Sequence, residues 1–220
     1  MAYCSQKNLV IIGAGDFGRE VFTWASQAIT HGAPWRIKGF LDARKGKLDG
    51  FDGYAPILGN SQTYDIDDGD VFIGASGDPK DKLKFYLPII DKGGHFVNVI
   101  HPLASIGKNV QLGTGIVMAP FSCLSCDIKV GNHVAIGAFS SAGHDNVIGD
   151  WSQVCGHCSI NGGVTLGEKV FLGDHACIIP QITVGDWAYV GAGSVVLRNV
   201  EPEHKVFGNP AKVIGRVERI

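Results

Sequence analysis

The sequence predicts two structural units, an α/β domain followed by a parallel β-helix, in a chain of 220 residues. An apolar run leads into a glycine-rich turn near the N-terminus, aliphatic residues recur at every sixth position from Ile100 to Val196, and a short final segment leaves that repeat. We therefore expect an N-terminal domain at residues 1–97, a β-helix at residues 98–200 and a C-terminal capping segment at residues 201–220.

The N-terminal unit begins with a Rossmann-like βαβ pattern. Residues 8–12 form a buried strand, which is followed by Gly13-x-Gly15-x-x-Gly18 and a helix. A second strand is expected to end at Asp42, which places a carboxylate where such folds contact a ribose.

Later elements of this unit are a strand at residues 70–74 and a helix around residues 80–92. Backbone N–H groups at a glycine turn can bind phosphate. We interpret Gly13, Gly15, Asp16 and Asp42 as binding the nucleotide part of a substrate. A glycine motif alone is weak evidence, so NAD-dependent redox chemistry and a purely structural turn stay open as alternatives.

The six-residue period fits neither an α-helix nor an alternating strand. It is typical of a parallel β-helix in which three hexads, 18 residues, make one turn. Gly follows the aliphatic residue in many hexads, and we interpret it as permitting the tight turn. Residues 18 apart should then lie one above another, about 4.8 Å apart. The aliphatic positions are Ile100, Ile106, Leu112, Met118, Leu124, Val130, Ile136, Ala142, Ile148, Val154, Ile160, Leu166, Leu172, Ile178, Val184, Val190 and Val196.

Two Cys-x-x-Cys pairs, Cys123/Cys126 and Cys155/Cys158, suggest a zinc site. The 18-residue columns argue against it, because the two pairs do not converge and Cys158 falls in an inward-facing column of small residues. We predict free thiols and no metal.

His157 and His175 lie 18 residues apart and are expected to form a two-rung ladder. A catalytic metal site on a prism needs three converging imidazoles. We interpret the two histidines as a stacked outward or interface pair, and keep a metal-dependent hydratase as an alternative.

Composition excludes several classes of partner. The net charge is −2, and no basic patch indicates a nucleic-acid partner. The apolar run near the N-terminus is too short for a signal peptide or a membrane span. We expect a soluble cytoplasmic protein without a membrane partner.

Several motifs together carry a family resemblance. They are the hexads and the segments Val10–Gly15, Val99–Pro102, Gly143–Gly149 and Val206–Lys212. In these the chain resembles the bacterial sugar O- and N-acyltransferases of the sialic acid O-acetyltransferase and bacillosamine N-acetyltransferase type. The resemblance implies a left-handed β-helix, an acyl-CoA donor, a nucleotide-linked amino sugar as acceptor, and a homotrimer with active sites between prisms.

The chain departs from that family at two places. The glycine turn often reads Gly-x-Gly-Gly-His in the family, whereas here Asp16 and Phe17 precede Gly18. Some members have a second histidine near the thioester, nine residues after the catalytic one. Here that position is Gln153, whose amide can still donate a hydrogen bond to a carbonyl.

Acyl transfer from a thioester needs a base, donors for the oxyanion and a groove that aligns the partners. His144 is the best candidate base, and the adjacent Asp145 would orient its ring. Gly162 lies one coil above His144, and its N–H is a reasonable oxyanion donor. A surface histidine without a role is the competing interpretation of His144.

The resemblance also places coenzyme A. It implies that the segment after residue 200 borders the CoA nucleotide, which assigns Pro210 and Lys212 to CoA binding. The same segment would cap the open end of the prism, as a solenoid requires. Ala192 and Gly193 lie on the upper coil, where the pantetheine arm would pass.

These inferences lead to one predicted activity. We expect an acetyl-CoA-dependent N-acetyltransferase acting on the amino group of a nucleotide-linked deoxysugar used in surface glycan or lipopolysaccharide synthesis. O-acetylation of a sugar hydroxyl and a non-catalytic trimeric scaffold that binds a nucleotide sugar are the alternatives.

Overall fold

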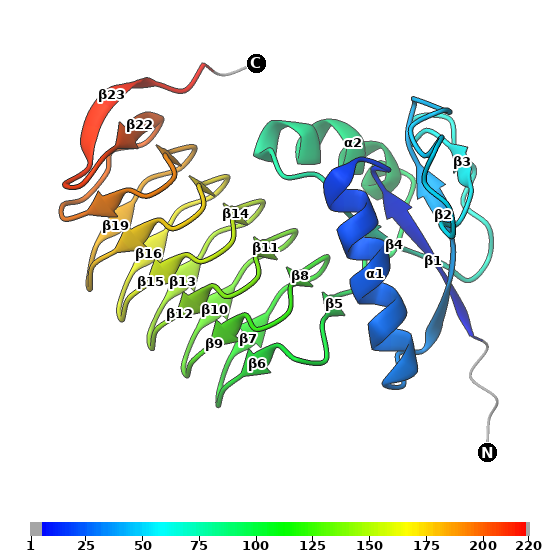
Figure 1. Ribbon diagram of the computed structural model, residues 1–220, viewed down its shortest axis with the longest axis horizontal. Helices are drawn as coiled ribbons and strands as arrows, with labels where there is room; N and C mark the ends of the chain where they lie inside the picture. The colour runs from blue at the N-terminus through cyan, green and yellow to red at the C-terminus, as the bar shows by residue number, and fades with distance from the viewer. Residues whose placement is uncertain (1–5, 219–220) are drawn as a thin grey trace.

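The computed structural model describes residues 6–218 and contains the two predicted units side by side (Figure 1). The predicted outer limits of the chain, residues 1 and 220, lie outside the described residues. An N-terminal α/β domain precedes a left-handed β-helix, so the predicted fold class is confirmed. In the described part of the chain, no helix has the length and apolar character needed to cross a lipid bilayer.

The N-terminal domain is a four-stranded parallel sheet with a helix on each face. Leu9 and Ile11 pack in the cluster that contains α1, and Val10 and Ile12 pack in the cluster that contains α2. The apolar run predicted as a buried strand is therefore covered on both sides, as parallel sheets require. The elements are β1 (Lys7–Ile12), α1 (Asp16–Thr30), β2 (Trp35–Leu41), β3 (Ile57–Gly59), β4 (Asp70–Gly74) and α2 (Pro79–Asp91), with strand order β3-β2-β1-β4.

The β-helix is a triangular prism whose three faces are parallel sheets of two-residue strands. Sheet I contains β5 (Val99–Ile100), β8 (Val117–Met118), β11 (Ala135–Ile136), β14 (Gln153–Val154), β17 (Phe171–Leu172) and β20 (Tyr189–Val190). Sheet II contains β6 (Ser105–Ile106), β9 (Cys123–Leu124), β12 (Ser141–Ala142), β15 (Ser159–Ile160), β18 (Cys177–Ile178) and β21 (Val195–Val196). Sheet III contains β7 (Gln111–Leu112), β10 (Lys129–Val130), β13 (Val147–Ile148), β16 (Thr165–Leu166) and β19 (Thr183–Val184).

The predicted 18-residue columns are confirmed by the strand register. Ser141 pairs with Ser159, and Ser159 pairs with Cys177. The aliphatic hexad positions form one continuous core inside the prism, except Ile106 in the first coil, which is 40% exposed. Cys158 is also buried there, as its column predicts.

Three edges join the sheets: one carries stacked aromatic rings, one carries His144, and one is covered by the N-terminal domain. The aromatic edge joins sheets I and II at residues 101–104, 119–122, 137–140, 155–158, 173–176 and 191–194. The His144 edge joins sheets II and III at residues 107–110, 125–128, 143–146, 161–164 and 179–182. The covered edge joins sheets III and I at residues 113–116, 131–134, 149–152, 167–170 and 185–188.

The glycine that follows the aliphatic residue has a different role from the predicted one. The left-handed residue of each turn stands two positions later, and non-glycine residues such as Asp145 occupy it with φ between 57° and 66°. A Cβ on Gly143 would lie 2.8 Å from the backbone nitrogen of Gly162 in the next coil. The glycine is therefore needed for close stacking of coils and not for the turn conformation.

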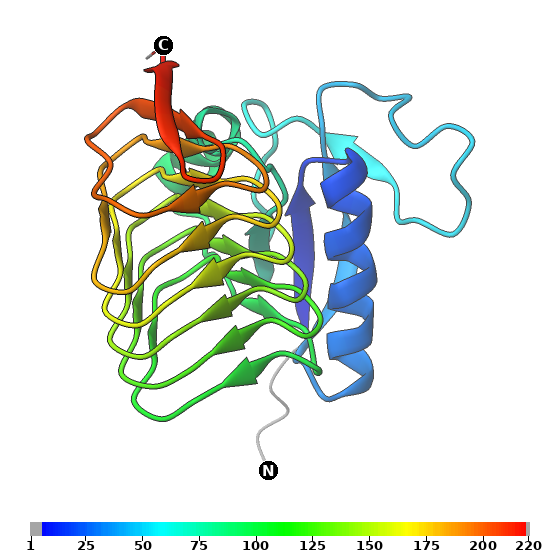
Figure 2. The ribbon, with the colours of Figure 1, turned by 60° about the vertical axis from the view of Figure 1, so that its left-hand side comes forward.

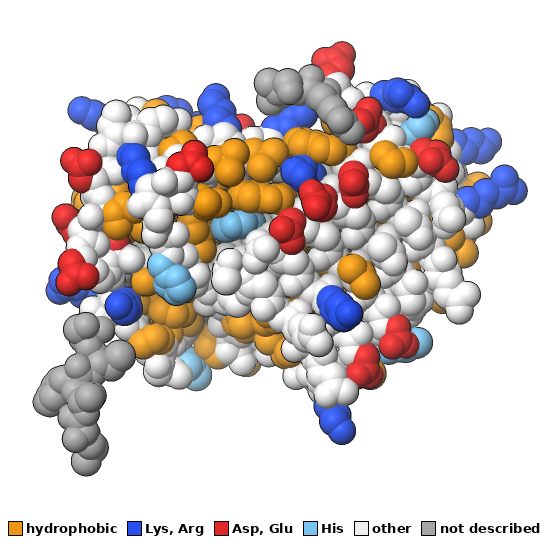
Figure 3. Space-filling view, turned by 180° about the vertical axis from the view of Figure 1, so that it is seen from behind, with side chains coloured by type: hydrophobic (Ala, Val, Ile, Leu, Met, Phe, Trp, Pro, Cys, Tyr) orange, Lys and Arg blue, Asp and Glu red, His pale blue; other side chains and the backbone are white. Residues whose placement is uncertain are grey.

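The N-terminal domain packs against sheet I and the covered edge of the prism (Figure 2). Tyr86 of α2 contacts the rings of His133 and Trp151 on the covered edge, and Phe96 contacts the ring of His133. Seen from behind, hydrophobic side chains gather toward the N-terminal domain and its border with the prism (Figure 3). The two units therefore share a buried boundary.

Lys82 of α2 crosses this boundary. Its side chain is buried, and its Nζ donates to the carbonyl oxygens of His133 at 3.1 Å and Ser152 at 2.9 Å on successive coils. Burial lowers the pKa of Lys82 to about 7. Helix α2 is thereby tied to the covered edge by a lysine that ionises near neutral pH.

Replacing Lys82 by methionine is expected to remove a pH dependence of stability. In the unfolded chain the amine titrates near its ordinary value of 10.5, so between pH 7 and 9 the unfolded state binds more protons than the folded state. The wild-type free energy of unfolding should therefore rise from pH 7 to pH 9, and this gain should disappear as the pH falls back toward 7. Chemical denaturation at pH 7, 8 and 9 measures the slope.

The buried thiols set the upper limit of this window. Burial raises the pKa of Cys155 to about 12 and that of Cys158 to about 11, which opposes the lysine effect above pH 9. The exposed Lys129→Met on sheet III is the matched control and should keep the wild-type slope. An unchanged slope in Lys82→Met would show that another group is responsible.

The C-terminal segment covers the upper end of the prism with a hairpin of β22 (His204–Phe207) and β23 (Lys212–Arg216). Strand β22 pairs in parallel with β20, and β23 pairs antiparallel with β22. The buried side chain of Val206 joins the core of the prism.

Candidate active site

The turn after β12 carries the predicted base. His144 Nδ1 lies 2.7 Å from Asp145 Oδ2, and both side chains are about two-thirds exposed, at 66% and 67%. With Nδ1 donating to the carboxylate, Nε2 is left unprotonated in the neutral ring and open to solvent. This arrangement suits a general base that reaches a substrate.

Gly162 lies directly above the His144 ring. A Cβ at Gly162 would stand 2.5 Å from His144 Nε2, so only glycine lets the ring occupy this position. The Gly162 N–H donates to no atom of residues 6–218. It is therefore available to a ligand that lies beside Nε2.

The next coil explains why the Gly162 N–H has no acceptor. At equivalent turn positions the N–H donates to an aspartate 18 residues later, as Gly156 does to Asp174 Oδ1 and Glu168 to Asp186 Oδ1, each at 2.9 Å. Pro180 stands at that position above Gly162 and offers no side-chain acceptor. The sequence thus leaves one outward donor next to the imidazole.

The column of residues above His144 leads to a cavity at the upper end of the prism. Arg198 lies 54 residues, or three coils, beyond His144. It lines a cavity of about 430 Å³ between the last coil and the hairpin, together with Pro210 and Lys212. Two of the predicted CoA residues are therefore brought together at the upper end of the His144 edge. Ala192 and Gly193 lie apart from them, exposed on the aromatic edge.

Gln153 is not brought to His144. It lies on β14 in sheet I, only 5% exposed, and its Oε1 has no hydrogen-bond partner in the described part of the chain. A separation of nine residues is one and a half hexads, which carries the chain from an edge to the opposite face of a three-sided coil. The donor contact predicted for Gln153 is therefore not available beside His144 of the same chain.

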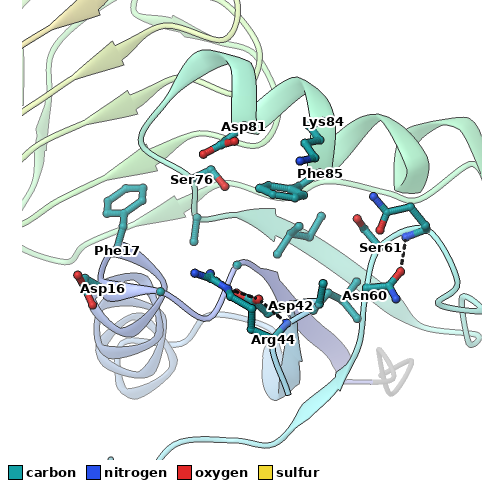
Figure 4. A pocket seen from close by; sticks show the side chains of 17 residues that line it. Asp16, Phe17, Asp42, Arg44, Asn60, Ser61, Ser76, Asp81, Lys84 and Phe85 are labelled. Atoms are coloured by element: carbon teal, nitrogen blue, oxygen red, sulfur yellow. Dashed lines mark hydrogen bonds and ion pairs between the residues drawn. The ribbon is translucent and has the colours of Figure 1, made fainter. Parts of the chain in front are cut away.

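The N-terminal domain contains a cavity of about 640 Å³ at the carboxyl ends of its strands (Figure 4). Gly13, Gly15, Asp16 and Asp42, the residues predicted to bind a nucleotide, all line it. This is the edge at which open parallel sheets bind nucleotides. The Asp16 carboxylate, 87% exposed, pairs with Arg19.

Asp42 is held by several donors. Its carboxylate accepts the Ala14 N–H at 3.0 Å and the Arg44 guanidinium at 2.8 Å and 2.9 Å. Burial acts to raise the pKa of Asp42, but the hydrogen bonds from Arg44 and Ala14 outweigh it and hold this pKa below its ordinary value. Asp42 is therefore ionised at neutral pH and organises the glycine turn.

Other residues of this cavity were not predicted. Asp81, Lys84 and Phe85 come from α2 and lie across the cavity from Asp42 and Arg44 (Figure 4). No sequence motif identifies these three residues, because packing decides which face of α2 borders the cavity. Ser76 follows β4 at the carboxyl edge of the sheet, and that position was a signal that could have identified it.

Comparisons with known proteins agree with both units. The PglD N-terminal domain model matches residues 8–89, and the model for the bacterial transferase hexapeptide (six repeats) matches residues 163–198. The sequence matches none of the curated proteins.

Three solved structures are similar over most of the chain. The acetyltransferase domain of PglB from Neisseria gonorrhoeae FA1090 is 25% identical with a TM-score of 0.85, over 94% of this chain and 100% of that one. WeeI from Acinetobacter baumannii AYE is 26% identical with a TM-score of 0.83, over 94% and 100%. PerB from Caulobacter crescentus, in complex with CoA and GDP-perosamine, is 28% identical with a TM-score of 0.81, over 94% and 97%.

Proposed function

We propose that this chain acetylates the amino group of a nucleotide-linked amino deoxysugar, because it belongs to the sugar acyltransferases with a PglD N-terminal domain and a left-handed β-helix. The chain is an acyl-CoA-dependent sugar acetyltransferase, and acetyl-CoA is its cosubstrate. Similar structures were solved with acetyl coenzyme A, or with CoA and GDP-perosamine. A role in surface glycan or lipopolysaccharide synthesis, and a cytoplasmic location, stay predictions.

The observation that carries this proposal is the open His144 Nε2 beside the free N–H of Gly162. As the sugar amine attacks the thioester carbonyl, Nε2 takes the proton of the amine and a C–N bond forms. The Gly162 N–H donates to the oxyanion of the tetrahedral intermediate. The C–S bond then breaks, and the protonated imidazole returns its proton to the leaving thiolate of CoA.

Asp145 has a supporting role in this mechanism. Its carboxylate accepts from Nδ1 and stabilises the imidazolium that forms during the reaction. Lys212 and Arg198 would bind the phosphates of CoA, three coils above His144, and Pro210 would border them without donating a hydrogen bond. Three coils at about 4.8 Å each span about 14 Å, a length that suits an extended pantetheine arm.

Hydroxyl acetylation is the second candidate. A hydroxyl is a weaker nucleophile than an amine at neutral pH and would depend more strongly on His144. A non-catalytic scaffold is disfavoured, because the His144–Asp145 pair and the free N–H of Gly162 would then have no role.

The position of His144 relative to the nucleotide cavity supports the homotrimer that the family resemblance implies. The His144 edge joins sheets II and III, so in the triangular section it lies opposite sheet I, against which the N-terminal domain packs (Figure 2). The width of the prism thus separates His144 from the nucleotide cavity of the same chain. We propose that His144 of one copy acts on the sugar bound in the cavity of another.

Thiol release from acetyl-CoA tests the proposed function. The acceptors are UDP-, dTDP- and GDP-linked 4-amino and 3-amino sugars, and the matched controls are the same nucleotides linked to sugars with hydroxyls at those carbons. Turnover with an amino sugar supports N-acetylation and identifies the nucleotide. Turnover with hydroxyl acceptors alone would favour the second candidate, and no turnover with either would contradict both.

Asp42→Ala is expected to weaken binding of the nucleotide sugar. Because Ala14 N–H loses its acceptor and Arg44 loses its partner, KM for the nucleotide sugar should rise by about tenfold or more. KM for acetyl-CoA should stay within about twofold of wild type, since the CoA cavity is on the prism. Steady-state kinetics with each substrate varied measures both values.

The control for this variant is Asp52→Ala, which removes an exposed carboxylate outside the cavity and should leave both KM values unchanged. An equal rise in both KM values for Asp42→Ala would point to a general structural defect instead of a binding role.

A further inference from the structure

The carboxylate of Asp42 is fully occupied by donors of its own chain. Oδ1 accepts the backbone N–H and the Nε–H of Arg44, each at 2.9 Å. Oδ2 accepts the Ala14 N–H at 3.0 Å and an Nη2–H of Arg44 at 2.8 Å. A carboxylate offers about four lone-pair sites, and the side chain of Asp42 is only 7% exposed. A ribose hydroxyl, the usual partner of an acidic residue after the second strand, would have to displace one of these donors.

The guanidinium of Arg44, in contrast, keeps donors that Asp42 does not use. Arginine has five N–H groups in a planar fork, and Asp42 takes one on Nε and one on Nη2. Both N–H groups of Nη1 and the second one of Nη2 donate to no atom of residues 6–218. The side chain is 65% exposed and lines the nucleotide cavity (Figure 4). These charged donors are therefore available to a ligand.

The fork lies beside the glycine-rich turn, because Nη2 of Arg44 and the N–H of Ala14 donate to the same oxygen of Asp42. Lys47 approaches this turn from the same loop, since a Cβ at Gly15 would lie 3.9 Å from Lys47 Cε. Helix α1 follows the turn without a side-chain cap, so its first N–H groups need a partner from outside the helix. The loop, the turn and the helix thus offer donors at one end of the cavity.

The surrounding charges place Arg44 between the two helices. Its hydrogen bonds to Asp42 and the carboxylates of Asp81 and Asp16 raise the pKa of Arg44, although burial acts to lower it. Asp81 belongs to α2 and Asp16 begins α1, so the guanidinium is within electrostatic reach of both helices. The Asp16 carboxylate is already paired with Arg19. An anion bound to Arg44 would therefore lie between the start of α1 and the side of α2.

We propose that Arg44 binds the diphosphate of the nucleotide sugar, and that Asp42 is a positioning residue that holds the guanidinium and accepts no ribose hydroxyl. The planar fork of arginine matches two phosphate oxygens, and such charge-assisted hydrogen bonds are about twice as strong as neutral ones. Because Asp42 reads no hydroxyl, the cavity accepts 2′-deoxyribonucleotides as well as ribonucleotides. The inference rests on the proposed function for its ligand and adds to it the residues that recognise that ligand.

Titration calorimetry with UDP, GDP and dTDP tests the contact without any acetyl transfer. Arg44→Ala is expected to raise the Kd of the diphosphate that binds the wild type by about tenfold or more. Lys45→Ala removes the same charge from the next residue, which is exposed outside the cavity, and its Kd should stay within about twofold of wild type. Unchanged acetyl-CoA binding shows that both variants are folded. Equal Kd values for wild type and Arg44→Ala, or no binding of any of the three diphosphates, would overturn the inference.

A double substitution tests whether Asp42 acts through Arg44. Asp42→Asn alone should raise the Kd of the same diphosphate severalfold, because the amide holds the guanidinium less well. In the Arg44→Ala background it should add no more than about twofold, since nothing is left to position. A direct ribose contact or a general structural role would instead make the two effects multiply, and that result would contradict a positioning role.

Matched nucleotide pairs test the ribose directly. The diphosphate that binds is compared with its counterpart that lacks or carries the 2′-hydroxyl, such as UDP with dUDP, and the two Kd values should agree within about threefold. A tenfold preference for the ribonucleotide that disappears in Asp42→Asn would restore Asp42 as the ribose ligand and overturn the inference. Diphosphate binding through Arg44 without thiol release from any acceptor would contradict the proposed function and leave this inference standing.

Discussion

His144→Ala is expected to lower kcat for thiol release by about a hundredfold or more while the protein stays folded. The imidazole is the only titratable ring that has an open nitrogen beside the free N–H of Gly162 in the described part of the chain. Without it, the amine must lose its proton to water. The measurement is steady-state turnover with the acceptor identified in the panel of nucleotide sugars.

A second substitution sharpens this test. Asp145→Asn keeps the ring but removes the carboxylate, so an intermediate loss is expected. Equal rates in wild type and His144→Ala would mean that another group is the base.

Gly162→Ala is expected to reduce kcat by about a hundredfold through displacement of the base. The added Cβ would stand 2.5 Å from His144 Nε2 and 2.7 Å from its Cε1, so the ring must leave its position. The backbone N–H is retained, which distinguishes this effect from loss of the oxyanion donor itself. Steady-state kinetics and thermal unfolding are the measurements.

Gly156→Ala is the matched control for this substitution. Gly156 holds the same turn position on the aromatic edge, and in its column Ala138 lies one coil below and Ala192 two coils above. A methyl group there would stand 3.2 Å from Asp174 Oδ1 and 3.4 Å from the Ala138 carbonyl oxygen, and it would meet no ring. Wild-type kcat is expected in Gly156→Ala. A full kcat in Gly162→Ala would show that the His144 ring does not act from its present position.

Much of the prism and its His144 edge could be predicted from the sequence, because a solenoid repeats contacts at a constant separation. Each residue of a coil meets the residue 18 positions later, so the hexads alone placed Gly162 above His144 and stacked His157 on His175. The glycine-rich turn and Asp42, which the sequence assigns to nucleotide binding, both lie at the cavity of the N-terminal domain, and their binding role stays a prediction. Both patterns are local along the chain or strictly periodic, and such patterns can be recognised in one sequence.

Only the tertiary structure decided how the two units meet. The sequence did not indicate that Lys82 would be buried against two carbonyls of the prism, or that Asp81, Lys84 and Phe85 would close the nucleotide cavity. It also did not show that Gln153 faces the N-terminal domain instead of His144. Packing between units depends on side-chain shape and on burial summed over both surfaces, and no period in the sequence encodes it. The sequence by itself thus determined the coil, its columns and the His144–Gly162 pair, while the fold decided that His144 and the nucleotide cavity lie on opposite sides of one chain.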